Sequence, residues 1–308
     1  MKQEQTTRIG ATTLSLSNLD KVLYPAVEFT KGQVIDYYRR ISDVLLPHLK
    51  DRPLTLKRYP EGVNGEFFYE KQCPAFRPKW IQVAPLWSRH KQQHISFCLV
   101  NDLASLVWVA NLADLELHPS LARHQKPEQP TMMVFDLDPG PGTDILDCAR
   151  VGLWLRDLLA KFKLKSFPKT SGSKGLQVYV PLNTKVTFDE TKAFSHAVAS
   201  IIAEAHPGQT VTKMAKSLRH GKVFIDWSQN DNHKTTVCVY SLRAREQPSV
   251  STPLRWTEVE RGLKSGKAGA FFFLTEDVLK RVKRSGDLFE PVLTMKQKLP
   301  KESLSNGN

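Results

Sequence analysis

The chain has 308 residues, of which 41% are hydrophobic and 24% are charged, and its formal net charge is +13 at pH 7. This composition is typical of a folded soluble protein, and the sequence shows neither a transmembrane span nor a signal peptide, so we expect a cytoplasmic protein with no membrane partner. A large surplus of Lys and Arg indicates a polyanionic partner, most often nucleic acid.

The four cysteines, Cys73, Cys98, Cys148 and Cys238, are far apart and form no C-x-x-C pair. Close pairs mark zinc ribbons, and disulfide frameworks are typical of small secreted domains. The sequence therefore predicts buried thiols rather than a disulfide or a zinc site.

The N-terminal part begins with a largely polar segment, residues 1–12, which we expect to be disordered. Residues 13–17 alternate as in a short strand. Thr30 is a suitable N-cap for a helix over residues 31–46, and Pro47 is expected to end that helix.

The next elements combine basic and aromatic residues. Strands are expected over residues 54–58 and 65–71, which contain Lys57-Arg58 and Phe67-Phe68-Tyr69. A strand over 94–100 and a helix over 102–113 follow. Basic residues beside aromatic ones suit phosphate contact combined with base stacking.

The central segment, Met132 to Gly142, is an apolar run that ends in Asp136 and Asp138 and then breaks at Pro and Gly. On a strand these two carboxylates point to the same side and raise each other's pKa unless a cation lies between them. Hard oxygen ligands favour magnesium or manganese. The alternative is an Asp-rich turn at a strand end that binds no metal.

The segment from Thr170 to Val180 contains Ser171, Gly172 and Lys174 ahead of a β-type run. Glycine lets backbone N–H groups approach a phosphate, and Ser and Lys add a hydroxyl and a charge. The spacing differs from that of a Walker loop.

The segment from Val223 to Asn230 is a second short strand that ends in a carboxylate, Asp226. If this strand neighbours the central one, three carboxylates could hold two metal ions about 3.5–4 Å apart, as in phosphoryl and nucleotidyl transfer. Residues 234–240 are expected to form its hairpin partner and to deliver Lys234 and Arg243 to the phosphate side.

Helices are expected over residues 144–162 and 188–205, and two short helices follow Thr257. Residues 213–222 are strongly basic, which indicates a cationic rim beside the Asp226 strand. The tail from Lys296 is polar and is expected to be disordered.

Taken in order, the three motifs resemble those of the archaeo-eukaryotic primase superfamily, and more narrowly those of the polymerase domain of bacterial DNA ligase D, an end-joining ligase that works with Ku. The stretches that carry the resemblance are Asp136-Leu137-Asp138-Pro139-Gly140, Thr170 to Leu176, Phe224 to Asn230, Lys213 to Arg219 and Tyr240 to Arg243. The resemblance extends from about residue 16 to about residue 291.

The resemblance implies an α+β fold with a primase-like catalytic sheet flanked by helices and a packed N-terminal α/β subdomain. It implies a polymerase domain over residues 13–295, with a DNA-gripping part at about 13–130, a catalytic part at about 131–295, and a polar tail over 296–308.

The implied activity is template-directed nucleotide addition that fills gaps and extends 3′ ends at double-strand breaks, with a preference for ribonucleotides. Asp136, Asp138 and Asp226 would bind two divalent cations, Mn²⁺ or Mg²⁺. The implied partners are gapped or broken DNA with a 5′-phosphate, NTP or dNTP, Ku, and a ligase domain or protein. The implied location is the bacterial nucleoid.

The resemblance also implies two sets of binding residues. The nucleotide would contact Lys57, His118, Ser171, Lys174, Gln177, Lys234 and Arg243. The DNA would contact Asn18, Lys21 and Lys31 at a 5′-phosphate, Arg58, Phe68, Tyr69 and Lys71 at the template, and Arg219.

Two positions depart from the family pattern. Many members have His at the position of Gln177, so either Gln177 contacts the phosphates without a charge, or Ser171 and Lys174 make that contact together with Arg243. The family often has Phe-Phe-Glu-Lys where this chain has Phe68-Tyr69-Glu70-Lys71. Which ring stacks on the template is therefore open.

Three other functions are compatible with parts of the sequence. A phosphatase of the haloacid dehalogenase class also opens with a strand and Asp-x-Asp, but it requires Thr or Val where this chain has Gly140, and it leaves Asp226 unexplained. A non-catalytic DNA-end binding module needs only the basic and aromatic residues. A primase proper is a nearer relative but does not need the 5′-phosphate residues.

Overall fold

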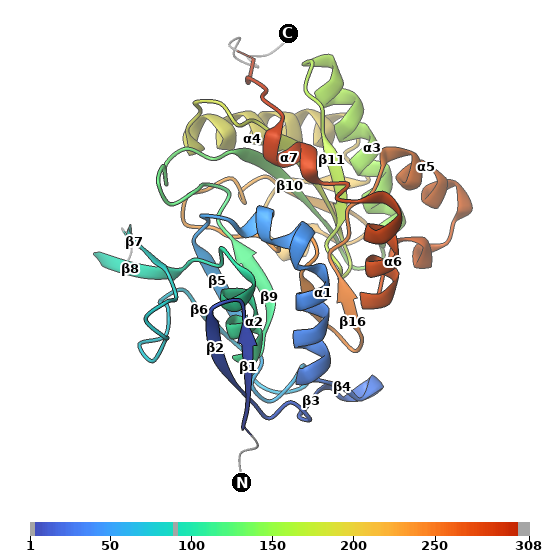
Figure 1. Cartoon of the computed structure of the whole chain (residues 1–308). Helices are drawn as coiled ribbons and strands as arrows, with labels where there is room; N and C mark the ends of the chain where they lie inside the picture. The colour runs from blue at the N-terminus through green and yellow to red at the C-terminus, as the bar shows by residue number, and fades with distance from the viewer. Residues whose placement is uncertain (1–3, 89–91, 301–308) are drawn as a thin grey trace. The chain divides into compact units, whose positions relative to one another are not determined.

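The computed structural model describes residues 4–88 and 92–300, which form two compact units (Figure 1). Unit 1 comprises the described residues up to Gln125 together with 235–251 and 273–287, and unit 2 comprises 126–234, 252–272 and the described residues from Leu288. The expected single boundary near residue 130 differs from this division, because two later segments return to unit 1. Each unit mixes helices and sheets, in agreement with the expected α+β class.

Unit 1 contains most of the strands. They are β1 (Glu4–Ile9), β2 (Thr12–Ser17), β3 (Val22–Tyr24), β4 (Phe29–Thr30), β5 (Leu54–Arg58), β6 (Phe68–Glu70), β7 (Val83–Ser88), β8 (Gln93–Cys98), β9 (Asp114–Pro119), β15 (Leu242–Ala244) and β16 (Pro248–Val250). Its helices are η1 (Pro25–Val27), α1 (Lys31–Leu49), α2 (Leu103–Asn111) and α6 (Thr275–Ser285).

Among its described residues, unit 2 has one sheet and all of the remaining helices. Its strands are β10 (Met132–Pro139), β11 (Phe167–Thr170), β12 (Leu176–Pro181), β13 (Thr210–Val211) and β14 (Val223–Asp226). Its helices are α3 (Ile145–Lys161), α4 (Phe188–Ala205), η2 (Lys216–Leu218), α5 (Trp256–Ser265), η3 (Ala268–Phe271) and α7 (Glu290–Thr294).

The main sheet of unit 1 has the order β6-β5-β8-β7, and β9 also pairs with β5. The strands expected over residues 54–58 and 65–71 are β5 and the shorter β6, and they pair with Leu56 to Arg58 opposite Phe68 to Glu70. The predicted strand and helix near residues 94–113 are β8 and α2, and the Asp102 side chain caps α2 by accepting from the Ser105 N–H.

Helix α1 begins as predicted and ends later than predicted. The Thr30 side chain accepts a hydrogen bond from the Gln33 N–H at 3.3 Å, which is the predicted N-cap. The helix continues past Pro47 to Leu49, because Pro47 lies in the last turn and removes only one intrahelical hydrogen bond there.

The buried side of α1 is tied to distant parts of unit 1. The Tyr37 hydroxyl donates to the Tyr240 carbonyl at 2.8 Å, and the Tyr38 hydroxyl donates to the Leu115 carbonyl at 2.7 Å. The Tyr38 hydroxyl also accepts from the Leu242 N–H at 3.1 Å. Both rings are almost fully buried, so these bonds fix β9 and the start of β15 against the helix.

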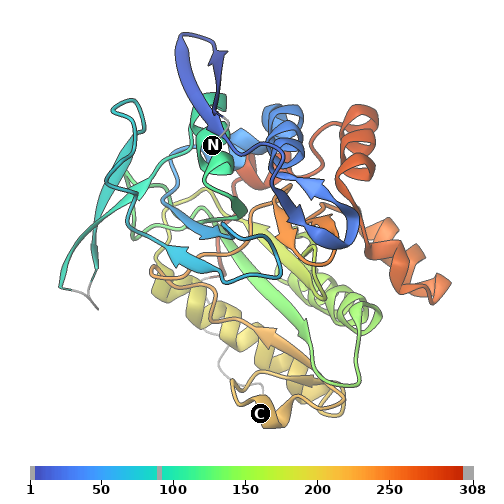
Figure 2. The same cartoon turned by 90° about the horizontal axis from the view of Figure 1, so that it is seen from below.

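The expectation of a disordered N-terminus was wrong for residues 4–12. β1 pairs antiparallel with β2 over its whole length, and Figure 2 shows the two strands as a separate two-stranded ribbon. Gly10 has a φ of +58°, a conformation that glycine adopts without steric cost, and this residue makes the tight turn between the strands. The pairing satisfies the backbone N–H and C=O groups of this segment, which its polar sequence alone does not predict to be ordered.

The prediction that the cysteines are all free thiols was also wrong. Cys73 and Cys98 form a disulfide across a sequence separation of 25 residues, whereas Cys148 and Cys238 are buried free thiols. The Cys73 N–H donates to the Ser96 carbonyl at 2.7 Å, so the segment after β6 is held along β8. The spacing of Cys73 and Cys98 in the sequence did not indicate a disulfide, because the fold of the sheet brings these two residues together.

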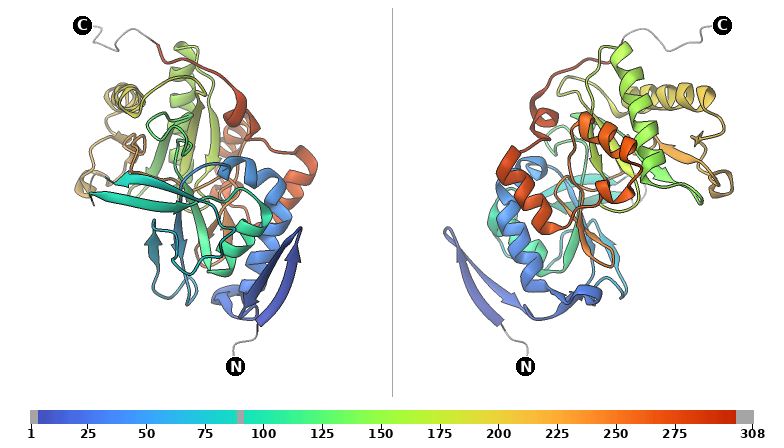
Figure 3. Two further views of the ribbon diagram at one scale, coloured as in Figure 1. Left: turned by 60° about the vertical axis from the view of Figure 1, so that its left-hand side comes forward. Right: turned by 90° about the vertical axis from the view of Figure 1, so that its right-hand side faces the viewer.

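The sheet of unit 2 has the order β11-β12-β10-β14-β13, and all its pairs are antiparallel except β13 with β14. The predicted helices over 144–162 and 188–205 are confirmed as α3 and α4, which the right-hand view of Figure 3 shows on one side of the sheet. Leu137 and Leu176 point to this side, where their side chains approach Gly152 of α3.

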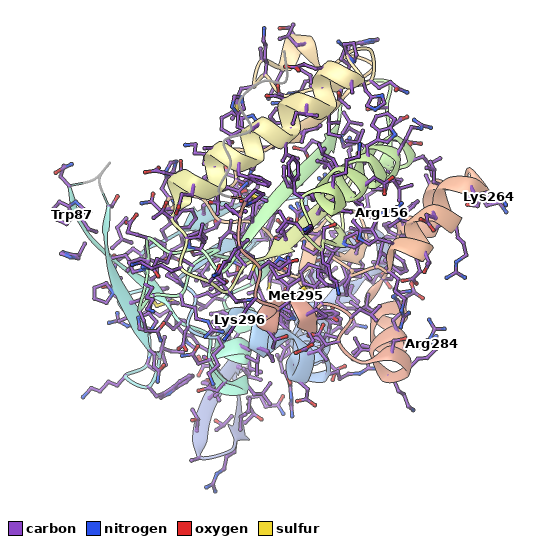
Figure 4. All side chains as sticks on the ribbon, turned by 90° about the horizontal axis from the view of Figure 1, so that it is seen from above. Trp87, Arg156, Lys264, Arg284, Met295 and Lys296 are labelled. Carbon is purple, nitrogen blue, oxygen red and sulfur yellow. A yellow bond between two sulfur atoms is a disulfide. The ribbon has the colours of Figure 1, made fainter. Side chains whose placement is uncertain are left out.

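Outside the sheet, α3 is tied to α5. The guanidinium of Arg156 on α3 forms an ion pair with Glu260 at 2.5 Å, and Figure 4 shows Arg156 extending toward the helix that carries Lys264. Trp256 packs beneath the same guanidinium at 5.6 Å.

Two further expectations for unit 2 were wrong. β14 has β10 and β13 as its neighbours, so residues 234–240 are not its hairpin partner, and Lys234 and Arg243 belong to different units. The tail is ordered at Gln297, whose side-chain amide donates to the Pro181 carbonyl at 2.8 Å and to the Lys165 carbonyl at 3.0 Å. Among the described residues, no helix is long and apolar enough to span a membrane.

Candidate active site

Four polar residues form a row across the sheet of unit 2. Lys169 lies opposite Gln177, Gln177 opposite Asp136, and Asp136 opposite Asp226, on β11, β12, β10 and β14 in turn. Directly opposed residues of antiparallel strands share a face, and Asp138 shares it too because it lies two residues after Asp136. This face is the one opposite to α3, and the predicted convergence of the three aspartates is present here.

Asp136 is the electrostatic centre of the row. Burial and the neighbouring charges of Asp138 and Asp226 raise its pKa to about 7, against the effects of a hydrogen bond from Gln177 and of the charge of Lys169. Its Oδ1 atom is buried and has no hydrogen-bond partner within the described residues. A buried, unsatisfied carboxylate oxygen is a position where a cation would be bound favourably.

Asp226 is held by the residues that follow it. Its Oδ1 accepts from the Ser228 N–H at 2.9 Å and from the Ser228 hydroxyl at 2.6 Å, and its Oδ2 accepts from the Gln229 amide at 2.8 Å. Asn230 bonds the backbone of Val134 in both directions, at 2.8 and 2.7 Å, so this turn is fixed to β10. The residue types after Asp226 are explained by these bonds.

The three carboxylates are not arranged as a ready metal cluster. Within the described ranges, no group of three or more His, Cys, Asp and Glu side chains is placed to hold a metal ion. Asp226 is engaged with Ser228 and Gln229, and each carboxylate oxygen retains a second lone pair. The residues nevertheless fit divalent cations, because they offer hard oxygen donors, mutual repulsion and one unsatisfied oxygen, on Asp136.

The loop after β11 lies at the end of β10. The Ser171 hydroxyl accepts from the Gly175 N–H at 3.1 Å and from the Ser173 N–H at 3.2 Å, so it shapes the loop. A Cβ on Gly175 would lie 2.2 Å from the Leu137 carbonyl and 3.6 Å from Asp138 Oδ1, so only glycine allows this approach. Lys174 in the same loop is exposed to solvent.

Two further cations lie near the aspartates within unit 2. The Lys234 ammonium donates to the Ser228 hydroxyl at 2.7 Å, beside Asp226. The Arg219 guanidinium stacks on the Phe224 ring at 3.7 Å, and Phe224 lies directly opposite Asp138. Lys234 therefore lies beside Asp226 although the hairpin expected to deliver it is absent from the described sheet.

Close packing against the backbone requires glycine at position 140. A Cβ at this position would lie 1.8 Å from the Arg219 carbonyl, and the Gly140 N–H donates to the Lys222 carbonyl at 2.9 Å. Neither the Thr nor the Val required by the phosphatase alternative fits here.

Unit 1 contains a second polar centre, the Glu116 cluster, which consists of Glu116, Lys57, Tyr59, His118 and Arg243. Glu116 Oε1 lies 3.3 Å from the Lys57 ammonium and 3.4 Å from the Tyr59 hydroxyl. Its Oε2 lies 3.0 Å from His118 Nε2 and 3.2 Å from Arg243 Nε. Three residues predicted to bind nucleotide therefore meet on one buried carboxylate.

Burial and charge set the protonation of this cluster. Burial raises the pKa of Glu116, but the hydrogen bond from His118 and the charges of Arg243 and Lys57 outweigh it and hold that pKa well below its usual value. Burial lowers the pKa of Lys57, and Glu116 partly offsets this. Burial also lowers the pKa of His118, again against the effect of Glu116.

The three consecutive aromatic residues divide between two sides of β6. Phe67 and Tyr69 lie near the Lys57 ammonium, at 4.6 and 5.4 Å from their ring centres, whereas Phe68 lies over the Arg58 guanidinium at 5.1 Å. Phe67 and Phe68 therefore face opposite sides. All three rings are exposed, and Lys71 follows them at the surface.

The residues predicted to bind a 5′-phosphate gather around the start of α1. The Lys31 ammonium, on a side chain 5% exposed, donates to the Ser17 carbonyl at 2.6 Å. Burial and the nearby charges of Lys21 and Arg58 lower the pKa of Lys31 to about 8. Lys21 pairs with Glu61 at 2.7 Å, and Asn18 has a φ of +53° in the preceding turn.

Sequence analysis missed Glu116 and Lys169. Glu116 precedes His118 by two residues on a strand, a spacing that places both on one face, but an acidic residue among expected phosphate contacts drew no attention. Lys169 is fully buried at 5.5 Å from the Tyr179 ring centre, and a strand lysine ordinarily indicates an exposed face.

Comparison with known proteins agrees with the resemblance found in the sequence motifs. The family model described as "LigD, primase-polymerase domain" matches residues 30–289. The multifunctional non-homologous end joining protein LigD of Mycolicibacterium smegmatis is 39% identical over 283 residues, which are 90% of this chain and 36% of that protein. The bifunctional LigD of Bacillus subtilis is 33% identical over 300 residues, which are 94% of this chain and 47% of that protein.

The chain thus spans between about a third and a half of the length of these relatives. Among solved structures, the polymerase domain of Mycobacterium tuberculosis ligase D in complex with DNA matches with a TM-score of 0.84 and 37% identity. The match covers 92% of this chain and 99% of that one.

Proposed function

This chain belongs to the LigD primase-polymerase family, and on that basis we propose that it is a template-directed polymerase acting in non-homologous end joining. It would add nucleotides to a 3′-hydroxyl and release pyrophosphate, filling gaps and extending 3′ ends at double-strand breaks. The family assignment confirms the resemblance found in the sequence motifs. The relatives are longer than this chain, so the function of the full-length relatives is a proposal for this chain.

The observation that supports catalysis most directly is the opposed register of Asp136 and Asp226, with Asp138 on the same face. These three residues would hold two divalent cations, Mn²⁺ or Mg²⁺. When bound, the cations would lower the pKa of the primer 3′-hydroxyl and neutralise charge on the triphosphate and the leaving pyrophosphate.

The side chains around the aspartates would prepare this site in three ways. The Gln177 hydrogen bond and the Lys169 charge favour the ionised form of Asp136, which is the form that binds a cation. Ser228 and Gln229 fix the orientation of Asp226.

Each unit, taken by itself, contains residues that we propose contact a nucleotide. In unit 2, Lys174, Lys234 and the glycine-rich loop shaped by Ser171 would bind phosphates. In unit 1, Lys57 and Arg243 share the single negative charge of Glu116, so this pair retains a net positive charge for an anion. Gln177 already bonds Asp136, which supports Ser171, Lys174 and Arg243 as the residues that contact the triphosphate.

We assign recognition of a broken DNA end to the start of α1. Lys31 has carbonyl and hydroxyl partners from Ser17 but no carboxylate partner in the described part of the chain, so its charge is not neutralised locally. Together with Lys21 and Asn18, it would bind a 5′-phosphate on the far side of a gap.

The template would be bound by the aromatic and basic residues of β5 and β6 and by the basic segment near Arg219. Phe68 on Arg58 offers a flat surface for a base, and Tyr69 and Lys71 extend it. Ku, a ligase domain or protein, the nucleoid location and a preference for ribonucleotides are further parts of the proposal, and they are supported by family membership alone.

The decisive experiment is primer extension on a gapped duplex, with and without a downstream 5′-phosphate, with ribo- or deoxyribonucleotides, and with Mn²⁺ or Mg²⁺. We expect incorporation that Asp136→Ala with Asp138→Ala abolishes while DNA binding persists. Asp157→Asn, which changes an exposed carboxylate of α3, serves as the matched control. Unchanged DNA binding without any incorporation by the wild-type protein would instead identify an end-binding module, and synthesis without a primer would identify a primase proper.

A further inference from the structure

The His118 ring has one hydrogen-bond partner in the part of the chain that the structure describes. Its Nε2 atom lies 3.0 Å from Oε2 of Glu116. The other ring nitrogen, Nδ1, makes no hydrogen bond to any described residue. Which nitrogen carries the proton therefore depends on Glu116.

Glu116 accepts hydrogen bonds on both of its oxygens. Oε1 accepts from the Ala244 N–H at 3.1 Å and from the Tyr59 hydroxyl at 3.4 Å. As ion pairs, the Lys57 ammonium lies 3.3 Å from Oε1 and Arg243 Nε lies 3.2 Å from Oε2. A backbone N–H, an ammonium and a guanidinium can only donate. The carboxylate is therefore ionised, and its Oε2 atom also accepts from His118.

An accepting Oε2 requires His118 Nε2 to carry a proton. The ring is neutral overall, because Lys57 and Arg243 already bring two positive charges to one buried carboxylate and disfavour a third. The lowered pKa of His118 agrees with this reasoning. A neutral imidazole protonated on Nε2 has a lone pair on Nδ1, which makes Nδ1 an acceptor.

We propose that Glu116 is a positioning residue that fixes His118 as a hydrogen-bond acceptor at Nδ1, so that His118 recognises a hydroxyl group of the nucleotide sugar and not its phosphates. A hydroxyl can donate to this lone pair, whereas an ionised phosphate oxygen only accepts and is repelled by it. The proposal rests on the proposed function for the identity of the ligand, and it assigns the phosphates to Lys57 and Arg243.

The tautomer is tested first, in the full chain without ligand, by nitrogen-15 NMR of the histidine rings at neutral pH. We expect His118, identified by its absence in His118→Ala, to be neutral and protonated on Nε2. Glu116→Gln should lose this fixed tautomer, because an amide can donate as well as accept. Asp36→Asn, which removes the same charge from an exposed site on α1, should leave the spectrum of His118 unchanged. A wild-type ring that is protonated on Nδ1, or on both nitrogens, overturns the proposal.

Ligand recognition is tested by calorimetric titration with a ribonucleoside triphosphate, its 2′-deoxy and 3′-deoxy analogues, and inorganic triphosphate. We expect one deoxy analogue to bind the wild-type protein roughly fivefold more weakly than the ribonucleotide, as for one lost hydrogen bond. His118→Ala and Glu116→Gln should remove that difference, and His118→Ala should leave the affinity for inorganic triphosphate unchanged.

Two results would contradict the hydroxyl assignment: equal binding of all three nucleotides by the wild-type protein, or weaker binding of inorganic triphosphate by His118→Ala. Neither measurement depends on turnover. A protein with the expected tautomer and hydroxyl discrimination but no incorporation on gapped DNA would disprove the polymerase function and leave the role of Glu116 standing. Incorporation with a tautomer on Nδ1 would do the reverse.

Discussion

Asp136 on β10 and Asp226 on β14 lie directly opposite each other in an antiparallel pair, although 90 residues separate them along the chain. Two carboxylates in this relationship destabilise the fold when both are ionised and no cation is present.

Metal-free protein should lose stability as the pH rises from 4 to 8. The pKa of Asp136 is raised to about 7, so the folded state binds a proton over a range in which the unfolded chain has released it, and this contribution fades as the pH rises. Its upper limit is about 4 kcal/mol. Urea unfolding with a chelator at pH 5 and pH 8 measures it. Asp136→Asn should remove this pH dependence and Asp157→Asn should keep it; a dependence that survives in Asp136→Asn contradicts the assignment.

Removing the buried charge of Lys169 should raise the pKa of Asp136 further above 7. Lys169 lies in the same row, one position beyond Gln177, and its charge favours ionised Asp136. Carboxyl carbon-13 NMR of metal-free Lys169→Met measures this pKa. Lys185→Met, which removes an exposed charge from unit 2, should leave it unchanged. An unaltered pKa in Lys169→Met would mean that the row is not electrostatically coupled.

Stimulation of synthesis by a downstream 5′-phosphate should depend on Lys31 and decline above pH 8. Lys31 has a pKa of about 8, so it loses its charge as the pH rises through that value. Lys31→Met should lower the stimulation roughly tenfold, as for one lost charge-assisted bond. Arg39→Met, on the exposed side of the same helix, controls for general loss of charge. Equal stimulation in both variants at pH 7 would remove Lys31 from the 5′-phosphate site.

The exposed rings should separate into two functions. Phe68→Ala should weaken binding of primer–template roughly tenfold, because one stacked base contributes about 1–3 kcal/mol. Phe67→Ala should raise the KM for nucleotide instead, since Phe67 lies 4.6 Å from the Lys57 ammonium. DNA affinity and nucleotide KM are measured for both variants. The opposite pattern would assign template stacking to Phe67.

The Cys73–Cys98 disulfide should stabilise unit 1 locally. Closing a loop of this length is worth about 2–4 kcal/mol, and the loss should be concentrated in the segment after β6. Hydrogen exchange with and without reductant measures protection of residues 71–82. Cys73→Ser with Cys98→Ser should reproduce the reduced state and respond no further to reductant. Identical exchange in both conditions would show that backbone bonds alone hold the segment.

The catalytic sheet was predictable because its signals are local. Apolar runs that end in Asp136 and Asp226 identify strand ends, whereas the pairing of the two strands was a condition of the predicted metal site that the structure supplied. Long amphipathic patterns similarly located α3 and α4. These features depend on alternation and periodicity, which a single sequence displays directly.

The remaining features depend on contacts between distant segments. The Cys73–Cys98 disulfide, the pairing of β1 and the docking of Gln297 all require a partner that the local sequence does not specify. Glu116 was missed for a related reason: its partners Lys57, His118 and Arg243 come from β5, β9 and β15. A carboxylate is informative only when its neighbours in space are known.

The bonds from Tyr37 and Tyr38 to Tyr240 and Leu242 have a consequence for biosynthesis. During translation, α1 leaves the ribosome about 200 residues before the strand that accepts and donates those bonds. Unit 1 therefore cannot complete its core before residues 240–242 have been synthesised, and its apolar surfaces stay available to chaperones until then.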